Sequence, residues 1–188
     1  MKIILVRHGK HESGIHNGKL LKEGKKQAKL LALKLKKVRI AEFYSSDLKR
    51  AKETSDILEK ELNTPLVVTP VLREWDSKTI KENRKKWKRG YKDNFNRLKK
   101  FINKITKNKE VEGNILVVAH GQLNKLIMAI LLDLEIKKTI PFMQDNTCID
   151  VLEWHAHFKN WRLLLLNDTS HLDQNLNKLN TKYRHSLK

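Results

Sequence analysis

The sequence predicts an α/β fold, because short apolar runs typical of buried strands alternate along its 188 residues with longer segments of helical periodicity. Two of these runs end alike: residues 3–6 lead into an Arg-His-Gly tripeptide at 7–9, and residues 115–119 lead into a His-Gly pair at 120–121. Ligands of open α/β sheets bind at the carboxyl ends of the strands. We therefore expect a three-layer α/β/α sandwich with a mainly parallel central sheet, formed as one domain over residues 1–188.

The first half of the chain supplies three predicted strands and two helices. An apolar run over 2–7 predicts the first strand, and one apolar helical face over 21–37 predicts the first helix. A β-prone run over 40–45 predicts the second strand. A helix should then run to about residue 62, with Ser46 or Asp47 as its N-cap. The third strand is expected over 65–68, before a proline.

The second half adds two helices and three strands. Residues 81–106 carry an apolar stripe through an otherwise basic helix. A buried strand over 114–119 is followed by a helix over 121–132 that is apolar on one side. Two further strands are expected over 147–154 and 161–166. The remaining residues, 167–188, are polar and irregular, and we expect either one short helix or a frayed tail there.

Composition limits the classes of protein to consider. No run of 18 apolar residues occurs, and the apolar run at the start is too short for a signal peptide, so we expect a protein without membrane association. The single cysteine, Cys148, excludes an internal disulfide and is typical of a reducing compartment, which predicts a cytoplasmic protein.

The positive charge is concentrated in one segment. The formal net charge is +19, and residues 77–109 carry 14 Lys or Arg against 2 acidic residues. A field of this kind attracts anionic ligands or binds a nucleic-acid backbone. We expect this segment to form a small helical cap over the carboxyl-end site.

The tripeptide at 7–9 has the chemistry of a phosphate site. His8 stands at a strand end, where an imidazole can act as nucleophile, acid, base or anion ligand. Arg7 can bind two phosphate oxygens at once through its planar guanidinium. Gly9 allows the backbone to turn sharply and approach a ligand closely.

Five segments in order resemble the histidine phosphatase superfamily, which has the phosphoglycerate-mutase-like fold. They are the R-H-G tripeptide at 7–9, the L-L-K-E-G-K-K-Q-A segment at 20–28, the S-S-D-L-K-R-A-K-E-T segment at 45–54, L-R-E at 72–74 and H-G at 120–121. The tripeptide alone is weak evidence, but the ordered set is specific.

The resemblance implies a role for each matching residue. It implies that His8 is the nucleophile, which becomes phosphohistidine. Arg7, Arg50 and His120 match the positions that bind the phosphate. The backbone amides of Gly121 and Gln122, which open a helix, can add anion contacts. Such a site needs no metal and no other cofactor.

The general acid and the loop after His8 depart from the family pattern. Glu74 matches the position that protonates the leaving oxygen, but the glycine usual a few residues later is absent, so Asp76 is the alternative. Lys10 replaces an acid, and the usual asparagine six residues beyond the histidine is a glycine. Asn17 is the nearest substitute as a phosphate ligand.

Other histidines carry weaker signals. His155 and His157 have a spacing that suits two metal ligands, but they fall in a predicted hairpin loop, and we expect no metal there. His11 and His16 lie near the nucleophile in sequence, where they line the mouth of the site or, as the simpler expectation, belong to a solvated loop.

The sequence thus predicts a metal-independent phosphomonoester phosphatase that acts on a small anionic phosphorylated substrate through phosphohistidine. Two alternatives stay open. One is a phosphomutase that uses the same intermediate, although the chain is shorter than the glycolytic mutases. The other is a nucleic-acid or polyanion-binding protein that uses the basic segment. The sequence does not indicate an oligomeric state.

Overall fold

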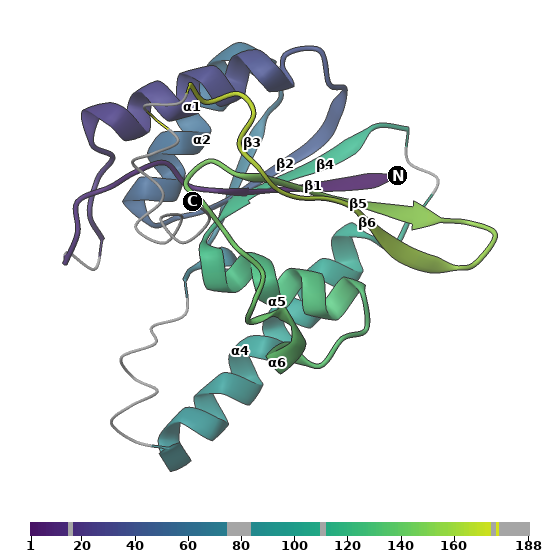
Figure 1. Ribbon diagram of the computed structural model, residues 1–188. Coiled ribbons are helices and arrows are strands. Elements are labelled where there is room, and N and C mark those ends of the chain that lie inside the picture. The colour runs from purple at the N-terminus through teal and green to yellow at the C-terminus, as the bar shows by residue number, and fades with distance from the viewer. Residues whose placement is uncertain (15–16, 75–83, 110–111, 174–175, 177–188) are drawn as a thin grey trace, which may run out of the picture.

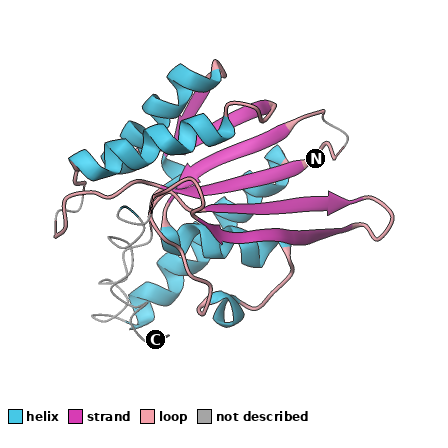
Figure 2. Cartoon of the chain, turned by 45° about the horizontal axis from the view of Figure 1, so that its top comes forward, coloured by secondary structure: helices cyan, strands magenta, loops and turns pink. Residues whose placement is uncertain are grey.

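The computed structural model describes residues 1–14, 17–74, 84–109, 112–173 and 176, with the backbone alone for 84–94. Six strands form one sheet in the order β3-β2-β4-β1-β5-β6. Their bounds are β1 (Lys2–Arg7), β2 (Ile40–Ser46), β3 (Leu66–Thr69), β4 (Asn114–Ala119), β5 (Ile149–His155) and β6 (Asn160–Asp168). The first four pair in parallel, whereas β5 is antiparallel to both of its neighbours (Figure 2).

Helices cover both faces of the sheet, as Figure 1 shows. One face carries α1 (Lys22–Leu35) and α2 (Lys49–Leu62), and the other carries α4 (Arg84–Ile105), α5 (Gly121–Leu131) and the short α6 (Ile136–Thr139). A 3-10 turn, η1 (Pro70–Leu72), follows β3. Each face has its own apolar cluster, and residues of β1 and β4 contribute to both. The predicted three-layer sandwich with a mainly parallel sheet is therefore confirmed.

The start of α2 differs from the predicted cap. Leu48 is the N-cap residue and makes no side-chain cap bond, so Ser46 and Asp47 do not cap this helix. The Asp47 carboxylate instead accepts hydrogen bonds from Arg73 Nε, at 2.8 and 3.0 Å, and from Arg73 Nη2, at 2.6 Å. The Ser46 hydroxyl turns toward His120, at 2.9 Å from its Nε2. Ser46 Oγ also accepts a hydrogen bond from the Leu48 amide at 3.3 Å, so it contacts the residue before the helix as well as His120.

The basic segment contributes to the core. Leu98, Ile102 and Ile105 of α4 are buried in the apolar cluster beside α5, as their predicted stripe requires. The second half of α4 therefore packs against the face of the sheet that α5 covers. The cap over the site stays a prediction for the rest of the segment. Residues 77–83 and the side chains of 84–94 lie outside the described residues.

The carboxyl-terminal segment is more ordered than predicted. β6 continues to Asp168, and Leu172 and Leu176 are buried. The described part of the predicted polar tail thus packs against the protein, while 177–188 lie outside the described residues. No helix in the described ranges is long and apolar enough to cross a membrane.

Candidate active site

The pairing of β1 with β4 brings two histidines together. Arg7 lies opposite Ala119 in the parallel register, so the next residue of each strand, His8 or His120, leaves the sheet at the same edge. The centroids of the two imidazole rings are 5.1 Å apart. Both side chains are buried, with 2% and 0% exposure. The two repeated motifs of the sequence therefore meet in one buried site.

Glycine is required directly after His8. A Cβ atom at Gly9 would lie 2.6 Å from the carbonyl oxygen of Gly24, which is backbone and cannot move aside cheaply. The Gly9 amide donates to Thr54 Oγ1 at 3.1 Å, and Thr54 Oγ1 donates to the Arg50 carbonyl at 2.7 Å. The loop after β1 is thus held closely against α1 and α2.

The hydrogen bonds of His8 define which ring nitrogen is nucleophilic. Nδ1 lies 2.8 Å from the Gly9 carbonyl oxygen, so Nδ1 carries the proton. Nε2 then carries a lone pair, which accepts a hydrogen bond from Arg50 Nε at 3.2 Å. Burial lowers the pKa of His8 well below 6.5, and the positive charge of Arg7 lowers it further. The ring is therefore neutral near neutral pH, as a nucleophile must be.

Two arginines surround this imidazole. Arg50 is buried with 7% exposure in the first turn of α2. Burial lowers the pKa of Arg50, the charge of Glu74 raises it, and Arg7 lowers it, which places these three groups in one electrostatic cluster. Arg7 donates from Nη1 to the Gln144 carbonyl, while its buried Nε has no partner among the described residues. A buried N–H without a partner is costly, and an anion in the site would satisfy it.

His120 also has a nitrogen without a partner. Its Nε2 lies 2.9 Å from Ser46 Oγ, and its buried Nδ1 has no partner in the described part of the chain. Burial lowers the pKa of His120 well below 6.5, with further lowering by Arg50 and Arg7. A bound phosphate would reverse the effect of these arginines, because a dianion favours the protonated imidazole.

Glu74 lies at the amino terminus of α5. Its carboxylate accepts hydrogen bonds from the backbone amides of Gln122 and Leu123, at 3.4 and 3.2 Å. The helix terminus that was expected to bind an anion thus holds the Glu74 carboxylate. A Cβ atom at Gly121 would lie 3.6 Å from Arg7 Nε, so this glycine borders the same site. Asp76, the alternative acid, lies outside the described residues.

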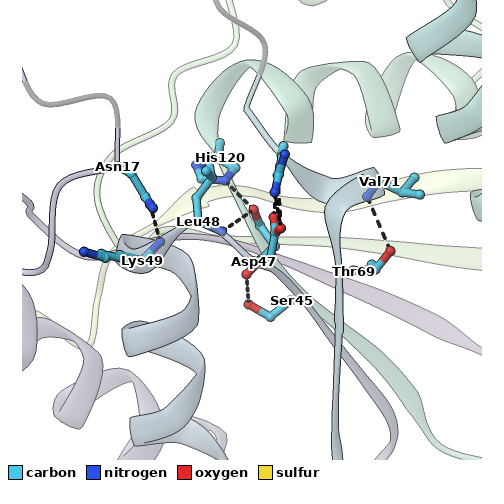
Figure 3. A network of polar contacts seen from close by, with 10 residues as sticks. Asn17, Ser45, Asp47, Leu48, Lys49, Thr69, Val71 and His120 are labelled. Carbon is cyan, nitrogen blue, oxygen red and sulfur yellow. Dashed lines mark hydrogen bonds and ion pairs between the residues drawn. The ribbon is translucent and has the colours of Figure 1, made fainter.

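Asn17 lies at the border of the site, in the loop between β1 and α1. Its Oδ1 accepts a hydrogen bond from the backbone amide of Lys49 at 2.7 Å, as Figure 3 shows. Asn17 therefore caps the first turn of α2, next to Arg50. The structure thus brings together all seven residues predicted from the sequence, with Asn17 at the edge.

The His11 ring lies 4.8 Å from the His8 ring, which fits the expectation that His11 lines the mouth of the site and not the simpler one of a solvated loop. Two further residues near the site were not singled out in the sequence. Asn146 Nδ2 donates to the His8 carbonyl at 3.0 Å, and the Gln144 carbonyl accepts from Arg7. Asp150 accepts from Gln144 Nε2 at 2.8 Å and supports that residue. The polar run at 144–147 before β5 was the available signal.

The histidine pair in the β5–β6 hairpin lies far along the sheet from this site. His155 Nδ1 accepts from the Phe158 amide at 3.3 Å, and the centroids of the His155 and His157 rings are 6.4 Å apart. No group of three or more metal-binding side chains occurs within the described residues.

Known proteins resemble the chain over nearly its full length. A phosphoserine phosphatase from Hydrogenobacter thermophilus is 26% identical, with 93% of this chain and 95% of that protein covered. The structure of a phosphoserine phosphatase from Entamoeba histolytica in complex with phosphoserine superposes with a TM-score of 0.73 at 21% identity, covering 92% and 99% of the two chains. The structure of a mycobacterial glucosyl-3-phosphoglycerate phosphatase in complex with inorganic phosphate superposes with a TM-score of 0.72 at 20% identity, covering 92% of this chain and 99% of that one.

The sequence profile of one family supports the same conclusion. The profile of the histidine phosphatase superfamily, branch 1, matches residues 3–169, which include every residue of the site described above. The structural neighbours establish the fold, and the profile establishes the family. The resemblance predicted from the five motifs is confirmed, and with it the enzyme class: this chain belongs to branch 1 of the histidine phosphatase superfamily and is a phosphatase.

Proposed function

We propose that this chain hydrolyses a small anionic phosphomonoester through a phosphohistidine formed at His8 Nε2, without a metal ion. The observation that carries the proposal is the state of His8. Its Nδ1 proton is held by the Gly9 carbonyl, and burial keeps the ring neutral, so the lone pair of Nε2 is available at the carboxyl end of β1. This is the arrangement that nucleophilic attack on phosphorus requires.

In the first step, Nε2 attacks phosphorus and the bond between phosphorus and the ester oxygen breaks. Arg50 now donates to Nε2, so substrate binding must transfer that N–H to a phosphoryl oxygen and expose the lone pair. Arg7 Nε and His120 Nδ1, which have no partner among the described residues, supply two further contacts to the oxygens. These fixed positive groups stabilise the charge of the transition state.

The leaving oxygen needs a proton, and Glu74 is the group proposed to supply it. In the second step, water attacks the phosphohistidine, Glu74 takes the proton of the water, and inorganic phosphate leaves with His8 restored. Glu74 interacts electrostatically with Arg50, so it lies near the reacting groups. Asp76 remains the alternative acid. Gly121 and Asn17 complete the proposed site by shaping the mouth between α5 and α2.

The substrate is proposed to be a small phosphorylated metabolite, free in a reducing cytoplasm, as the buried free Cys148 supports. Phosphoserine is the first compound to test, because a relative covering nearly the full chain is named for that activity. A phosphomutase would transfer the phosphoryl group to a second sugar or acid phosphate in place of water, and a polyanion-binding protein would retain nucleic acid.

The experiment is a screen of phosphate esters with phosphate release as the readout, followed by acid and base quenching with a labelled substrate. We expect release of inorganic phosphate and a base-stable, acid-labile label on His8. Label on serine or cysteine would contradict the mechanism. Transfer of label to an acceptor phosphate faster than to water would favour the mutase. A gel shift at moderate salt tests for nucleic-acid binding, which weakens steeply with salt.

A further inference from the structure

His11 occupies the same relation to His8 as the proposed phosphate ligand His120 does. The centroid of the His11 ring lies 4.8 Å from that of His8, with an interplanar angle of 58°. The corresponding values for His120 are 5.1 Å and 60°. His8 is therefore in contact with two imidazoles at nearly equal separation and tilt, and only one of them has a role so far.

The loop that carries His11 is held in place from both sides. His11 pairs with Leu20 in an antiparallel bridge, and the Glu12 amide donates to the Lys19 carbonyl at 3.1 Å. The Leu20 amide donates to a Glu53 carboxylate oxygen on α2 at 2.8 Å. The Lys10 amide donates to Gln27 Oε1 on α1 at 2.9 Å. A side chain on so constrained a backbone meets the criterion of a preorganised contact.

The tautomer of His11 determines what it can do. Nδ1 lies 2.6 Å from the Glu12 carbonyl oxygen. A carbonyl oxygen can only accept a hydrogen bond, so Nδ1 carries the proton and donates it. Nε2 has no hydrogen-bond partner in the described ranges. In the neutral ring Nε2 is an acceptor and would face a phosphate oxygen unfavourably. In the protonated ring it becomes a charge-assisted donor.

We infer that His11 is a third histidine of the phosphoryl site, which takes up a proton when substrate binds and donates from Nε2 to a phosphoryl oxygen on the solvent side. The inference rests on the proposed function and adds a contact to it. It assigns this residue to binding of the anion and not to the attack on phosphorus. His11 would then make phosphate affinity depend on pH through a residue other than the nucleophile.

The charges around His11 make this proton uptake depend on the ligand. The titratable and charged groups facing it are His8 and Arg7 at the end of β1, Arg50 on α2, His120 before α5, and Glu12 and Glu53 near the loop bridge. Burial lowers the pKa of His11, and Arg50 and Arg7 lower it further, whereas the Glu12 carbonyl raises it. A phosphate dianion would offset the two arginines and raise the pKa again.

The test compares His11→Asn with the wild type. Asparagine places an amide N–H near the position of Nδ1, which keeps the bond to Glu12, and it removes Nε2. The dissociation constant of inorganic phosphate is measured by titration calorimetry from pH 5.5 to 8.5. We expect the variant to bind about tenfold more weakly at pH 6, the scale of one charge-assisted hydrogen bond, and about equally at pH 8.5. At each pH we compare the ratio of the dissociation constants of the variant and the wild type. The titration of phosphate and of the other site groups affects both proteins equally and therefore cancels in this ratio.

Two further variants make the result specific. His11→Gln places a neutral donor near the position of Nε2, and this donor does not titrate. The ratio of the dissociation constants of His11→Gln and His11→Asn for phosphate should therefore be the same at every pH, whereas the ratio for wild type and His11→Asn changes with pH. His157→Asn, in the exposed hairpin, should match the wild type at every pH. A His11→Asn ratio near one at pH 6, or a weakening that is equal at all pH values, would overturn the inference. Labelling of His8 is read separately, so failure here is distinguishable from failure of the proposed mechanism.

Discussion

Histidines lie side by side at both ends of the described sheet, and the two groups differ in their surroundings more than in the separation of their rings. At the carboxyl end of β1 and β4, the His8 and His120 rings are 5.1 Å apart, buried, and close to two arginines. In the β5–β6 hairpin, the His155 and His157 rings are 6.4 Å apart, and His157 is exposed. The residue type alone therefore does not distinguish a catalytic pair from a surface pair.

The two groups of histidines differ in burial and in the partners of their polar atoms. Burial and nearby cations lower the pKa of His8 and of His120, and two buried nitrogens of the site, Arg7 Nε and His120 Nδ1, have no partner among the described residues. In the hairpin, His155 stacks on Phe158 at 4.9 Å, and the Arg162 guanidinium lies 4.9 Å from the same ring. The ring and the cation thus contact each other, and among the described residues no buried polar atom of the hairpin lacks a hydrogen-bond partner.

The largest expected effect comes from removing the buried nucleophile. His8→Ala should lower turnover at least about a thousandfold, since removal of a nucleophile eliminates the covalent pathway. Steady-state phosphate release with saturating substrate measures the effect. Circular dichroism and a thermal melt should show that the variant is folded.

The matched change at the other end is His157→Ala. Its turnover should equal that of the wild type within about twofold, because an exposed side chain far from the site contacts no reacting atom. Equal losses in the two variants would contradict the assignment of the active site to the carboxyl end of β1.

The second effect compares two arginines. Arg50→Ala should lower turnover by roughly 100-fold, as loss of one preorganised charge stabiliser does. Arg162→Ala, which removes a cation from the Phe158 ring, should leave turnover unchanged. Because Arg50 is 7% exposed and its charge is little screened, the deficit should persist from 0.05 to about 0.5 M salt. A deficit that disappears with salt would show that Arg50 acts only in long-range attraction.

The fold could be predicted from the sequence because its strongest signals are local. Alternation of apolar runs and helical stripes located all six strands and the four longer helices, with ends displaced by a few residues. The N-cap of α2 was wrong, because Ser46 and Asp47 are used by His120 and Arg73, residues distant in sequence. For 167–188 the sequence left a short helix or a frayed tail open, because the few apolar residues there, among them the buried Leu172 and Leu176, stand in a mainly polar stretch.

The site shows the same limit. His8, Arg50 and His120 could be placed from motifs at the ends of strands. For His11 the sequence left two readings open, the mouth of the site or a solvated loop, because the choice depends on a bridge to Leu20 and on loop hydrogen bonds that have no sequence signature. The position of Glu74 on the α5 amides likewise depends on how η1 and α5 pack.

A smaller effect concerns the stability cost of burying polar groups at the catalytic end. Asp150 accepts from Gln144, whose carbonyl holds Arg7, and burial raises the pKa of Asp150 to about 6. The folded value lies above the ordinary 3.8, so this group stabilises the folded state below pH 4, and that contribution is lost as the pH rises through 6.

Urea unfolding at pH 4 and pH 8 measures this contribution. Between pH 4 and pH 8, the free energy of unfolding of Asp150→Asn should rise by roughly 2 kcal/mol relative to that of the wild type, because only the wild type must ionise a buried carboxyl group. Glu153→Gln is the control on the same strand, since Glu153 pairs with Lys2 at 3.4 Å and is 35% exposed. An Asp150→Asn difference that does not change with pH would contradict the buried ionisation.

The smallest expected effect is that of metal removal, at either end of the sheet. Arg7 and Arg50, joined by His120 once a bound phosphate favours its protonated form, supply the positive charge that a divalent ion supplies in many phosphoryl-transfer enzymes. Incubation with a chelator followed by desalting should therefore leave turnover within error of the untreated protein. A variant of the hairpin tests whether its histidine pair holds a metal ion. His155→Ala should leave turnover unchanged, and it should also leave unchanged any zinc content measured by mass spectrometry. The reason is that the described residues offer no third ligand beside His155 and His157. Activity that is lost with chelator and restored by one divalent ion would show that the charges at the carboxyl end are insufficient, and the proposed mechanism would then need a metal at that end.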